Sequence, residues 1–203
     1  LGPIKLMKLF GLVHDIDKIF SMPDKELFMT RIFNESMISD FHKLKDASDE
    51  NFLKVIDKCK EQNIEIMPLV DERYPIFLKN IPYPPVTLFL KGDLSLLYVR
   101  KIAIVGSRKA DETSKQWAYK LAQDFIKKDY AIVSGGAIGI DYSAHMGALD
   151  ANGKTICVLG SGFSKMFPES HINLFRDIEE KGLLISEHLP NFPIIFIEVT
   201  KFF

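Results

Sequence analysis

Two glycine-bearing stretches could bind an anion, and each directly follows a short apolar run. The first, Gly106-Ser107-Arg108, ends the run "KIAIV", and the second, "SGGAIGID" at 134–141, follows "YAIV". Glycines let backbone N–H groups approach an anion without obstruction by Cβ. Serine hydroxyls donate hydrogen bonds, and the guanidinium of Arg108 matches a phosphate in two-point geometry. These residue types predict that a phosphate-bearing ligand binds here.

A helix candidate follows the second loop, and its positive N-terminal end would face the same anion. Asp141 is expected to cap this helix. If the two apolar runs are neighbouring strands, both loops open into one crevice beyond the carboxyl ends of the strands. The residues predicted from these loops are Gly106, Ser107, Arg108, Ser134, Gly135, Gly136 and Gly139.

A sheet is needed to position such loops, and the chain from about residue 86 predicts one. Short runs that are mostly apolar, as in parallel strands covered on both faces, occur at 86–92, 101–105, 130–133, 155–159 and 183–186. Helix candidates alternate with them at 113–128, 142–150 and 170–181, and the first places Trp117, Leu121 and Phe125 on one stripe. The alternation predicts an α/β protein with a Rossmann-like, doubly wound, mainly parallel sheet.

The N-terminal third differs from the rest of the chain in its pattern of apolar residues. Its apolar residues recur at helical spacing, so residues 1–66 are expected to form a small helical domain, and residues 67–203 the Rossmann-like domain. Prolines punctuate the stretch from 67 to 92, which favours extended chain and turns there.

Composition excludes several classes of protein. Lys and Arg number 26 against 27 Asp and Glu, so a nucleic-acid site would need locally concentrated positive charge. Cys59 and Cys157 lie far apart and form no zinc or disulfide spacing. The apolar start is too short to span a membrane. We expect a cytoplasmic protein with no metal and no cofactor.

The catalytic alternatives are less well supported. The dinucleotide pattern Gly-x-Gly-x-x-Gly and the triphosphate pattern ending in Gly-Lys-Ser/Thr are both absent from these loops. His145 could be a general base, but a histidine on a packed helix face is more often structural. Ser107 has no evident partner base, so a catalytic triad is unsupported.

Four ordered segments resemble the DNA-processing protein A (DprA/Smf) family. They are "DERYPIFLKNIPYPPVTLFLKGD" at 71–93, "IAIVGSRKA" at 102–110, "AIVSGGAIGIDYSAHMGAL" at 131–149 and "GKTICVLGSGFSKMFPESHINLFRDIEEKGLLISEHLP" at 153–190. The resemblance implies a protein that is not an enzyme, binds single-stranded DNA, delivers it to the RecA recombinase in natural transformation and forms a homodimer. It places the DNA pocket at the two loops, with Lys109 as a backbone contact or an ordinary solvated lysine.

An enzyme of the same superfamily, a phosphoribohydrolase or nucleoside transferase, is the alternative. Such relatives carry Pro-Gly-Gly-x-Gly-Thr-x-x-Glu, whereas this loop has no Glu at that spacing.

Two departures from the DprA/Smf pattern stand out. The family's Phe-Pro-x-Arg-Asn-Arg segment is replaced by "NFPIIFIEVTKFF", which predicts an incomplete domain with an exposed apolar edge at 192–203. The N-terminal unit lacks a Gly-x-Gly hairpin, so no DNA role is assigned to it.

Overall fold

The computed structural model describes residues 3–46 and 49–191. The α-helices are α1 (Pro3–Val13), α2 (Ile16–Ser21), α3 (Asp24–Met29), α4 (Glu35–Asp46), α5 (Asp49–Glu61), α6 (Ile76–Lys79), α7 (Glu112–Ile126), α8 (Ile140–Asp150) and α9 (Ile172–Lys181). The strands are β1 (Glu65–Pro68), β2 (Thr87–Gly92), β3 (Lys101–Ala103), β4 (Ala131–Ser134), β5 (Thr155–Leu159) and β6 (Leu183–Ser186). Short 3₁₀ helices are η1 (Leu94–Leu97), η2 (Phe163–Lys165) and η3 (Glu169–His171).

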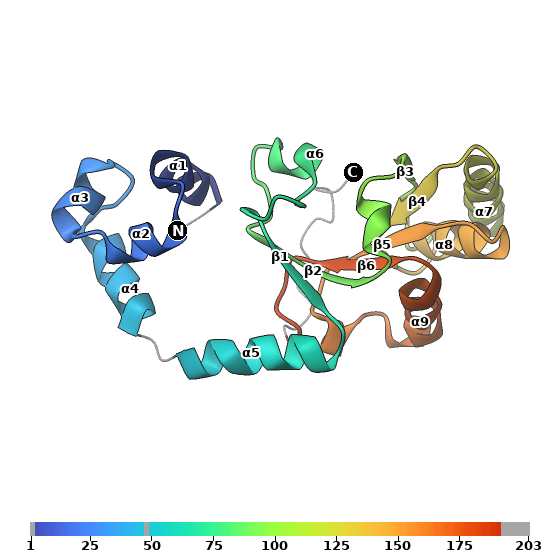
Figure 1. Ribbon diagram of the computed structural model, residues 1–203. Helices are drawn as coiled ribbons and strands as arrows, with labels where there is room; N and C mark the ends of the chain where they lie inside the picture. The colour runs from blue at the N-terminus through green and yellow to red at the C-terminus, as the bar shows by residue number, and fades with distance from the viewer. Residues whose placement is uncertain (1–2, 47–48, 192–203) are drawn as a thin grey trace.

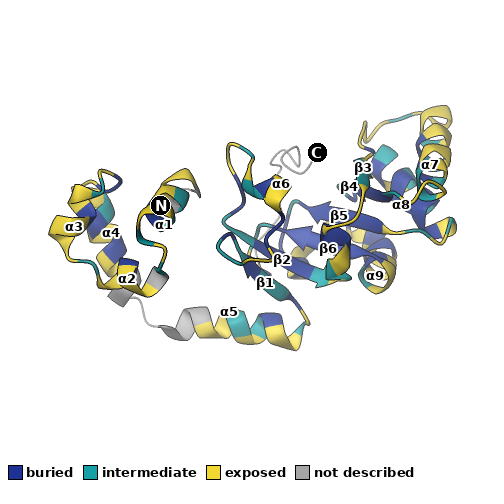
Figure 2. Ribbon diagram, turned by 45° about the horizontal axis from the view of Figure 1, so that its top comes forward, coloured by how far each residue is buried: buried dark blue, intermediate teal, exposed yellow. Residues whose placement is uncertain are grey.

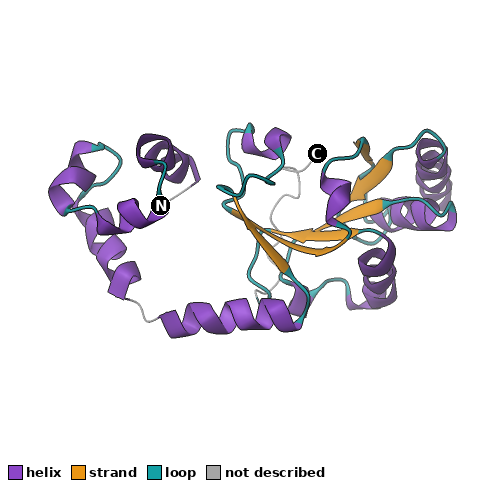
Figure 3. Cartoon of the chain, in the orientation of Figure 1, coloured by secondary structure: helices purple, strands orange, loops and turns teal. Residues whose placement is uncertain are grey.

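The described strands form one six-stranded sheet in the order β1-β2-β6-β5-β4-β3. The four strands from β3 to β6 are parallel to one another, β2 pairs with β6 in the antiparallel direction, and β1 pairs antiparallel with β2 at the edge of the sheet (Figure 3). The residues of β4, β5 and β6 are all buried, because both faces of these strands are covered. The predicted α/β class and mainly parallel sheet are confirmed, and β1 is a strand that the sequence did not predict.

Alternate residues of each central strand pack against different layers. Cys157 and Leu184 contact the core under α8 and α9, whereas Ile156 and Ile185 contact the core under the segment that holds α6 and η1. Helices α7, α8 and α9 lie together on one side (Figure 1). Because the consecutive strands β3 to β6 are also neighbours in the sheet, the crossovers among the described residues wind in one direction and include no reversal of the kind expected in a doubly wound sheet.

Small residues decide how α7 packs. Its buried residues are Ala118 and Ala122, which meet Ala144 and Ala148 of α8. A Cβ on Gly147 would lie only 2.2 Å from the carbonyl oxygen of Tyr119, so the two helices touch backbone to backbone. The stripe that the sequence singled out on this helix therefore faces outward over much of its length (Figure 2), with Trp117 at 71% and Leu121 at 46% exposure.

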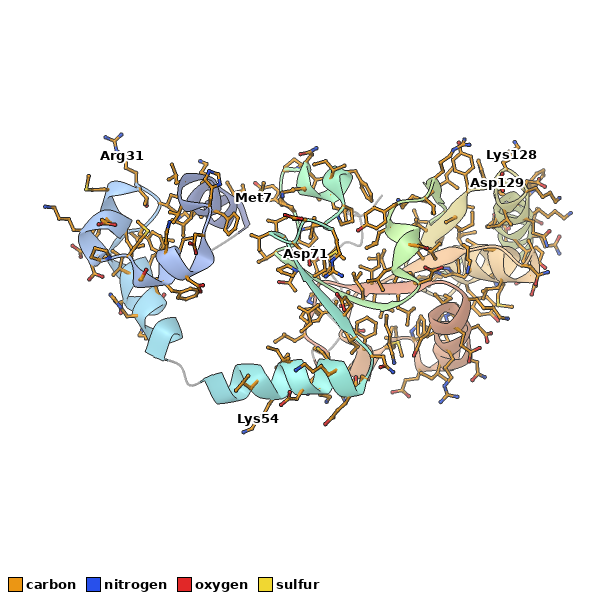
Figure 4. All side chains as sticks on the ribbon, viewed as in Figure 1. Met7, Arg31, Lys54, Asp71, Lys128 and Asp129 are labelled. Atoms are coloured by element: carbon orange, nitrogen blue, oxygen red, sulfur yellow. The ribbon has the colours of Figure 1, made fainter. Side chains whose placement is uncertain are left out.

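The N-terminal helices α1 to α4 have a core of their own and lie at one end of the molecule (Figure 1). Helix α5 belongs with the sheet instead, because Cys59 on it packs in the same cluster as Cys157 of β5. Met7 of α1 packs against the core on the α6 side of the sheet, near the segment that carries Asp71 (Figure 4). We propose a helical unit and an α/β unit with the boundary between α4 and α5, because the expected boundary at residue 66 falls inside β1.

Among the described residues, no helix is both long and apolar enough to cross a membrane. The apolar edge expected at 192–203 lies outside the described residues.

Candidate functional site

The two glycine loops lie side by side at one edge of the sheet. Strands β3 and β4 are parallel neighbours, with Ala103 paired to Val133, so the loops that leave their carboxyl ends emerge next to each other. The N–H of Ile140 donates to the carbonyl oxygen of Ser107 across 3.4 Å. The sequence-based expectation that the loops share one place in the fold is therefore confirmed.

An internal carboxylate joins these loops. Asp141 Oδ1 accepts a hydrogen bond from the N–H of Gly106 at 3.3 Å, and Oδ2 accepts one from the N–H of Gly135 at 3.2 Å. Asp141 lies in the first turn of α8 and Gly139 is the N-cap, so the expectation that Asp141 caps this helix is wrong. Its carboxylate turns back from the helix and clamps the two loops together.

This clamp changes what the loops can offer to a ligand. The side chain of Asp141 occupies the space between the Gly106 and Gly135 amides. The sequence predicts that an external phosphate binds to these amides. Burial raises the pKa of Asp141, although the N–H donors around it oppose the rise. Because these amides already have an acceptor, an external anion has to be held by other groups.

Several of the predicted contact residues are buried and shape the loops. Ser134 is fully buried, and its hydroxyl donates to the carbonyl oxygen of Ile104 at 2.7 Å. Gly136 has φ of +69°, and a Cβ there would lie 2.7 Å from the ring of Phe175. Neither residue faces solvent, and both support the shape of the loops in this structure, so their expected contact with a ligand stays a prediction.

Gly139 is also needed where the loops cross. Its φ is +93°, and a Cβ would lie 2.4 Å from the carbonyl oxygen of Ser107. A larger residue would push the first loop away from the second.

The solvent-exposed part of the predicted site is the turn Gly106–Lys109, all of whose residues are exposed. The N–H of Lys109 donates to Ser107 Oγ at 3.1 Å, which closes the turn and leaves the serine hydroxyl hydrogen available as a donor. Two cationic residues, Arg108 and Lys109, therefore lie in the exposed turn that the clamp holds at Gly106.

A hollow of about 570 Å³ lies beside this turn, and no sequence motif indicates it. Its walls come from three separate parts of the chain, and they include Lys115, Gln116, Lys120, Ile138, Tyr142 and His171. The rings of Tyr142 and His171 are 4.6 Å apart, and His171 Nδ1 lies 3.0 Å from the carbonyl oxygen of Gly136. Gly139 lies at the border between the hollow and the exposed turn.

His145 has a structural position. Its side chain is completely buried, with Nδ1 2.7 Å from Thr155 Oγ1, whose hydroxyl donates to the carbonyl oxygen of Ile132. Burial, with a smaller contribution from His171, lowers the pKa of His145 to about 3. A neutral ring without solvent access favours the structural alternative over a general base.

Three aromatic residues that follow strands β4 and β5 differ in exposure. Phe163 is buried, whereas Tyr142 is 38% and Phe167 is 45% exposed. Phe167 borders a second hollow of about 630 Å³ together with Lys165. Both partly exposed rings lie on loops or helix starts near the same edge of the sheet.

Comparison with known proteins shows which family and which relatives the chain resembles. The family model for DNA recombination-mediator protein A matches residues 65–197, starting at the first residue of β1. The DNA processing protein DprA of Bacillus subtilis is 38% identical over 138 residues, which are 68% of this chain and 46% of that protein. The chain spans about half the length of the curated relatives that it matches.

Two solved structures share the fold. The X-ray structure of DprA from Streptococcus pneumoniae superposes with a TM-score of 0.68 at 35% identity, covering 77% of this chain and 53% of that one. DNA processing protein A from Helicobacter pylori, described for its single-stranded DNA binding mode, gives 0.56 at 29% identity, covering 68% and 60%. With its α/β sheet and paired glycine loops, this chain belongs to the DNA recombination-mediator protein A (DprA/Smf) family.

Proposed function

We propose that this chain binds single-stranded DNA, with the exposed turn Gly106–Lys109 as the contact to the phosphate backbone. The observation that carries the proposal is the clamp by Asp141, because it fixes a turn that presents Arg108 and Lys109 at the carboxyl edge of parallel strands. Cationic side chains and hydroxyls track a phosphate backbone without distinguishing bases. Membership of a DNA recombination-mediator family supports the same ligand.

Local charge supports this location on a chain whose net charge is −1. Lys115 and Lys120 line the neighbouring hollow, and Lys165 lines the second one, so each hollow contributes further positive charge. Glu112 also lines the first hollow, where it is paired with Lys115 at 2.7 Å. The proposed path for the strand runs along this edge of the sheet.

Replacing Arg108 tests the proposal. A charge-assisted contact contributes about 1.5–3 kcal/mol, so Arg108→Ala should weaken binding of labelled oligo-dT by about tenfold or more. The loss should be similar for other base sequences, and the slope of log affinity against log salt should become shallower by about 0.7, as for one phosphate contact. Fluorescence anisotropy at two salt concentrations, with oligo-dT and a duplex, measures both quantities.

Arg31→Ala is the matched control, because Arg31 is an exposed arginine at the far end of the molecule (Figure 4). It should leave both the affinity and the salt slope unchanged. An Arg108→Ala protein that binds oligo-dT as wild type does, with the same slope, would remove the turn from the proposed interface.

We also propose that the chain is a binding protein and not an enzyme. The support is that the titratable side chains beneath the loops, Asp141 and His145, are buried away from the exposed Ser107. Incubation with nucleoside monophosphates, monitored for release of the free base, tests this point. Turnover would favour the nucleotide-processing alternative.

Delivery of the strand to RecA and pairing of two copies are proposed from family membership alone. Light scattering of the purified chain measures its oligomeric state. A RecA filament-assembly assay on DNA coated with a single-strand-binding protein measures delivery, and an unchanged assembly rate would contradict it.

A further inference from the structure

We propose that the hollow between α7 and the start of α8 holds a base of the bound strand, stacked on Tyr142. This inference rests on the proposed function, because it names a subsite next to the proposed phosphate contact. Nothing in the glycine motifs indicates it, since Tyr142 lies outside the loops and His171 is 29 residues further along the chain (171 minus 142).

The size and lining of the hollow fit a nucleobase. Its volume of about 570 Å³ lies within the usual range for small-molecule sites. Tyr142 and Ile138 give it an aromatic and an aliphatic surface, and both side chains are at least one-third exposed. Gln116 and Ser143 supply groups that can donate or accept hydrogen bonds at the edge of a base.

The ring of Tyr142 is held in place before any ligand binds. It lies 4.6 Å from the ring of His171, measured between centroids, and His171 is fixed by its contact with the carbonyl oxygen of Gly136. A fixed aromatic ring loses little conformational entropy on binding, so stacking on it is more favourable. Stacking of a base on an aromatic side chain contributes about 1–3 kcal/mol.

The hollow borders the exposed turn. Gly139 lines the hollow, and a Cβ added to it would lie 2.4 Å from the carbonyl oxygen of Ser107 and 3.0 Å from that of Arg108. When Arg108 binds a phosphate of the strand, the nucleoside attached to that phosphate lies next to the opening of the hollow. Lys115 and Lys120 on the facing helix can contact the following phosphate.

An abasic oligonucleotide separates stacking from phosphate contacts. Tyr142→Ala should weaken binding of oligo-dT by about five- to tenfold, at the lower end of the stacking range because the ring is only partly exposed. The same variant should bind an abasic strand of equal length within about twofold of wild type. Tyr142→Phe keeps the ring and should retain the wild-type preference for oligo-dT over the abasic strand. Tyr83→Ala, at an exposed tyrosine outside the hollow, is the matched control and should change neither affinity.

The outcomes distinguish this inference from the function beneath it. If Arg108→Ala weakens binding of both probes while Tyr142→Ala changes neither, the base subsite is wrong and the DNA-binding surface stands. If Arg108→Ala changes neither probe, the proposed function itself fails. An equal loss for both probes in Tyr142→Ala would also overturn stacking, because it would show a general disturbance of the surface.

Photo-crosslinking provides a test on the wild-type protein that does not depend on a folded variant. An oligo-dT in which 5-iodouracil replaces thymine should crosslink to the peptide that contains Tyr142 on irradiation. Crosslinks found only on other peptides would refute the subsite.

Discussion

Removing the carboxylate of Asp141 should destabilise the protein and weaken DNA binding together. Asp141→Ala leaves the amides of Gly106 and Gly135 without their acceptor, at the point where the two loops are joined. A hydrogen bond to a charged group contributes about 1.5–3 kcal/mol, and distances of 3.2 and 3.3 Å place these two at the lower end. Loss of the two hydrogen bonds therefore lowers the unfolding free energy by about 3 kcal/mol before any offset.

The net loss is smaller, because the substitution also removes the cost of burying a charge. Asp141 is only 7% exposed, and burial raises the pKa of its carboxyl group, so burial opposes ionisation. We expect a net destabilisation of about 1–2 kcal/mol after this offset. For a chain of this length that lowers the melting temperature by about 2–8 °C. Affinity for oligo-dT should fall as well, since the turn that carries Arg108 loses its anchor.

The pH dependence provides a second readout. A carboxyl group whose pKa is raised in the folded state binds its proton more tightly when folded, so ionising it removes stability as the pH rises above the ordinary value of 3.8. The variant lacks this dependence. The difference in unfolding free energy between wild type and Asp141→Ala should therefore narrow as the pH increases through that window.

Urea unfolding at several pH values measures this difference, and Asp177→Ala on the exposed surface of α9 is the control for loss of a carboxylate. The reasoning would be refuted by an Asp141→Ala protein with wild-type stability and affinity. A stability difference that widens with increasing pH would contradict the raised pKa.

Two further predictions concern the residues around the clamp. Gly139→Ala should destabilise the protein by about 2–3 kcal/mol, because its φ is +93° and the added Cβ meets the Ser107 carbonyl. Gly11→Ala, in an open helical position, should instead be neutral or stabilising in the same urea titration; similar effects of both changes would contradict the close approach. His145 has a folded pKa of about 3 against an ordinary 6.5, so the folded protein binds fewer protons and should lose stability as the pH falls through this range. In urea titrations, the unfolding free energy of His145→Gln should fall less steeply with decreasing pH than that of the wild type. An equal slope for the two proteins would mean that His145 does not titrate as inferred.

Much of the α/β unit could be predicted from the sequence, because parallel strands buried on both faces are recognisable as apolar runs. The runs that became β2 to β6 and the helices α7 to α9 were all expected. Strand β1 was missed, since its four residues include Pro68 and lie in a stretch rich in prolines, where strand signals are weak. Hydrophobic spacing on α7 indicates the stripe with Trp117 and Leu121, which faces outward, because hydrophobicity does not reveal that Ala118 and Ala122 allow closer helix packing.

The sequence by itself determined the family, the parallel strands and the position of each glycine loop directly after an apolar strand, because all of these depend on residue type and spacing along the chain. Only the tertiary structure decided which groups meet there. It turned Asp141 back onto the amides of Gly106 and Gly135, buried Ser134, and brought Tyr142 and His171 together beside the exposed turn. Side-chain direction and contacts between distant segments depend on how the layers pack, and local sequence patterns do not encode that packing.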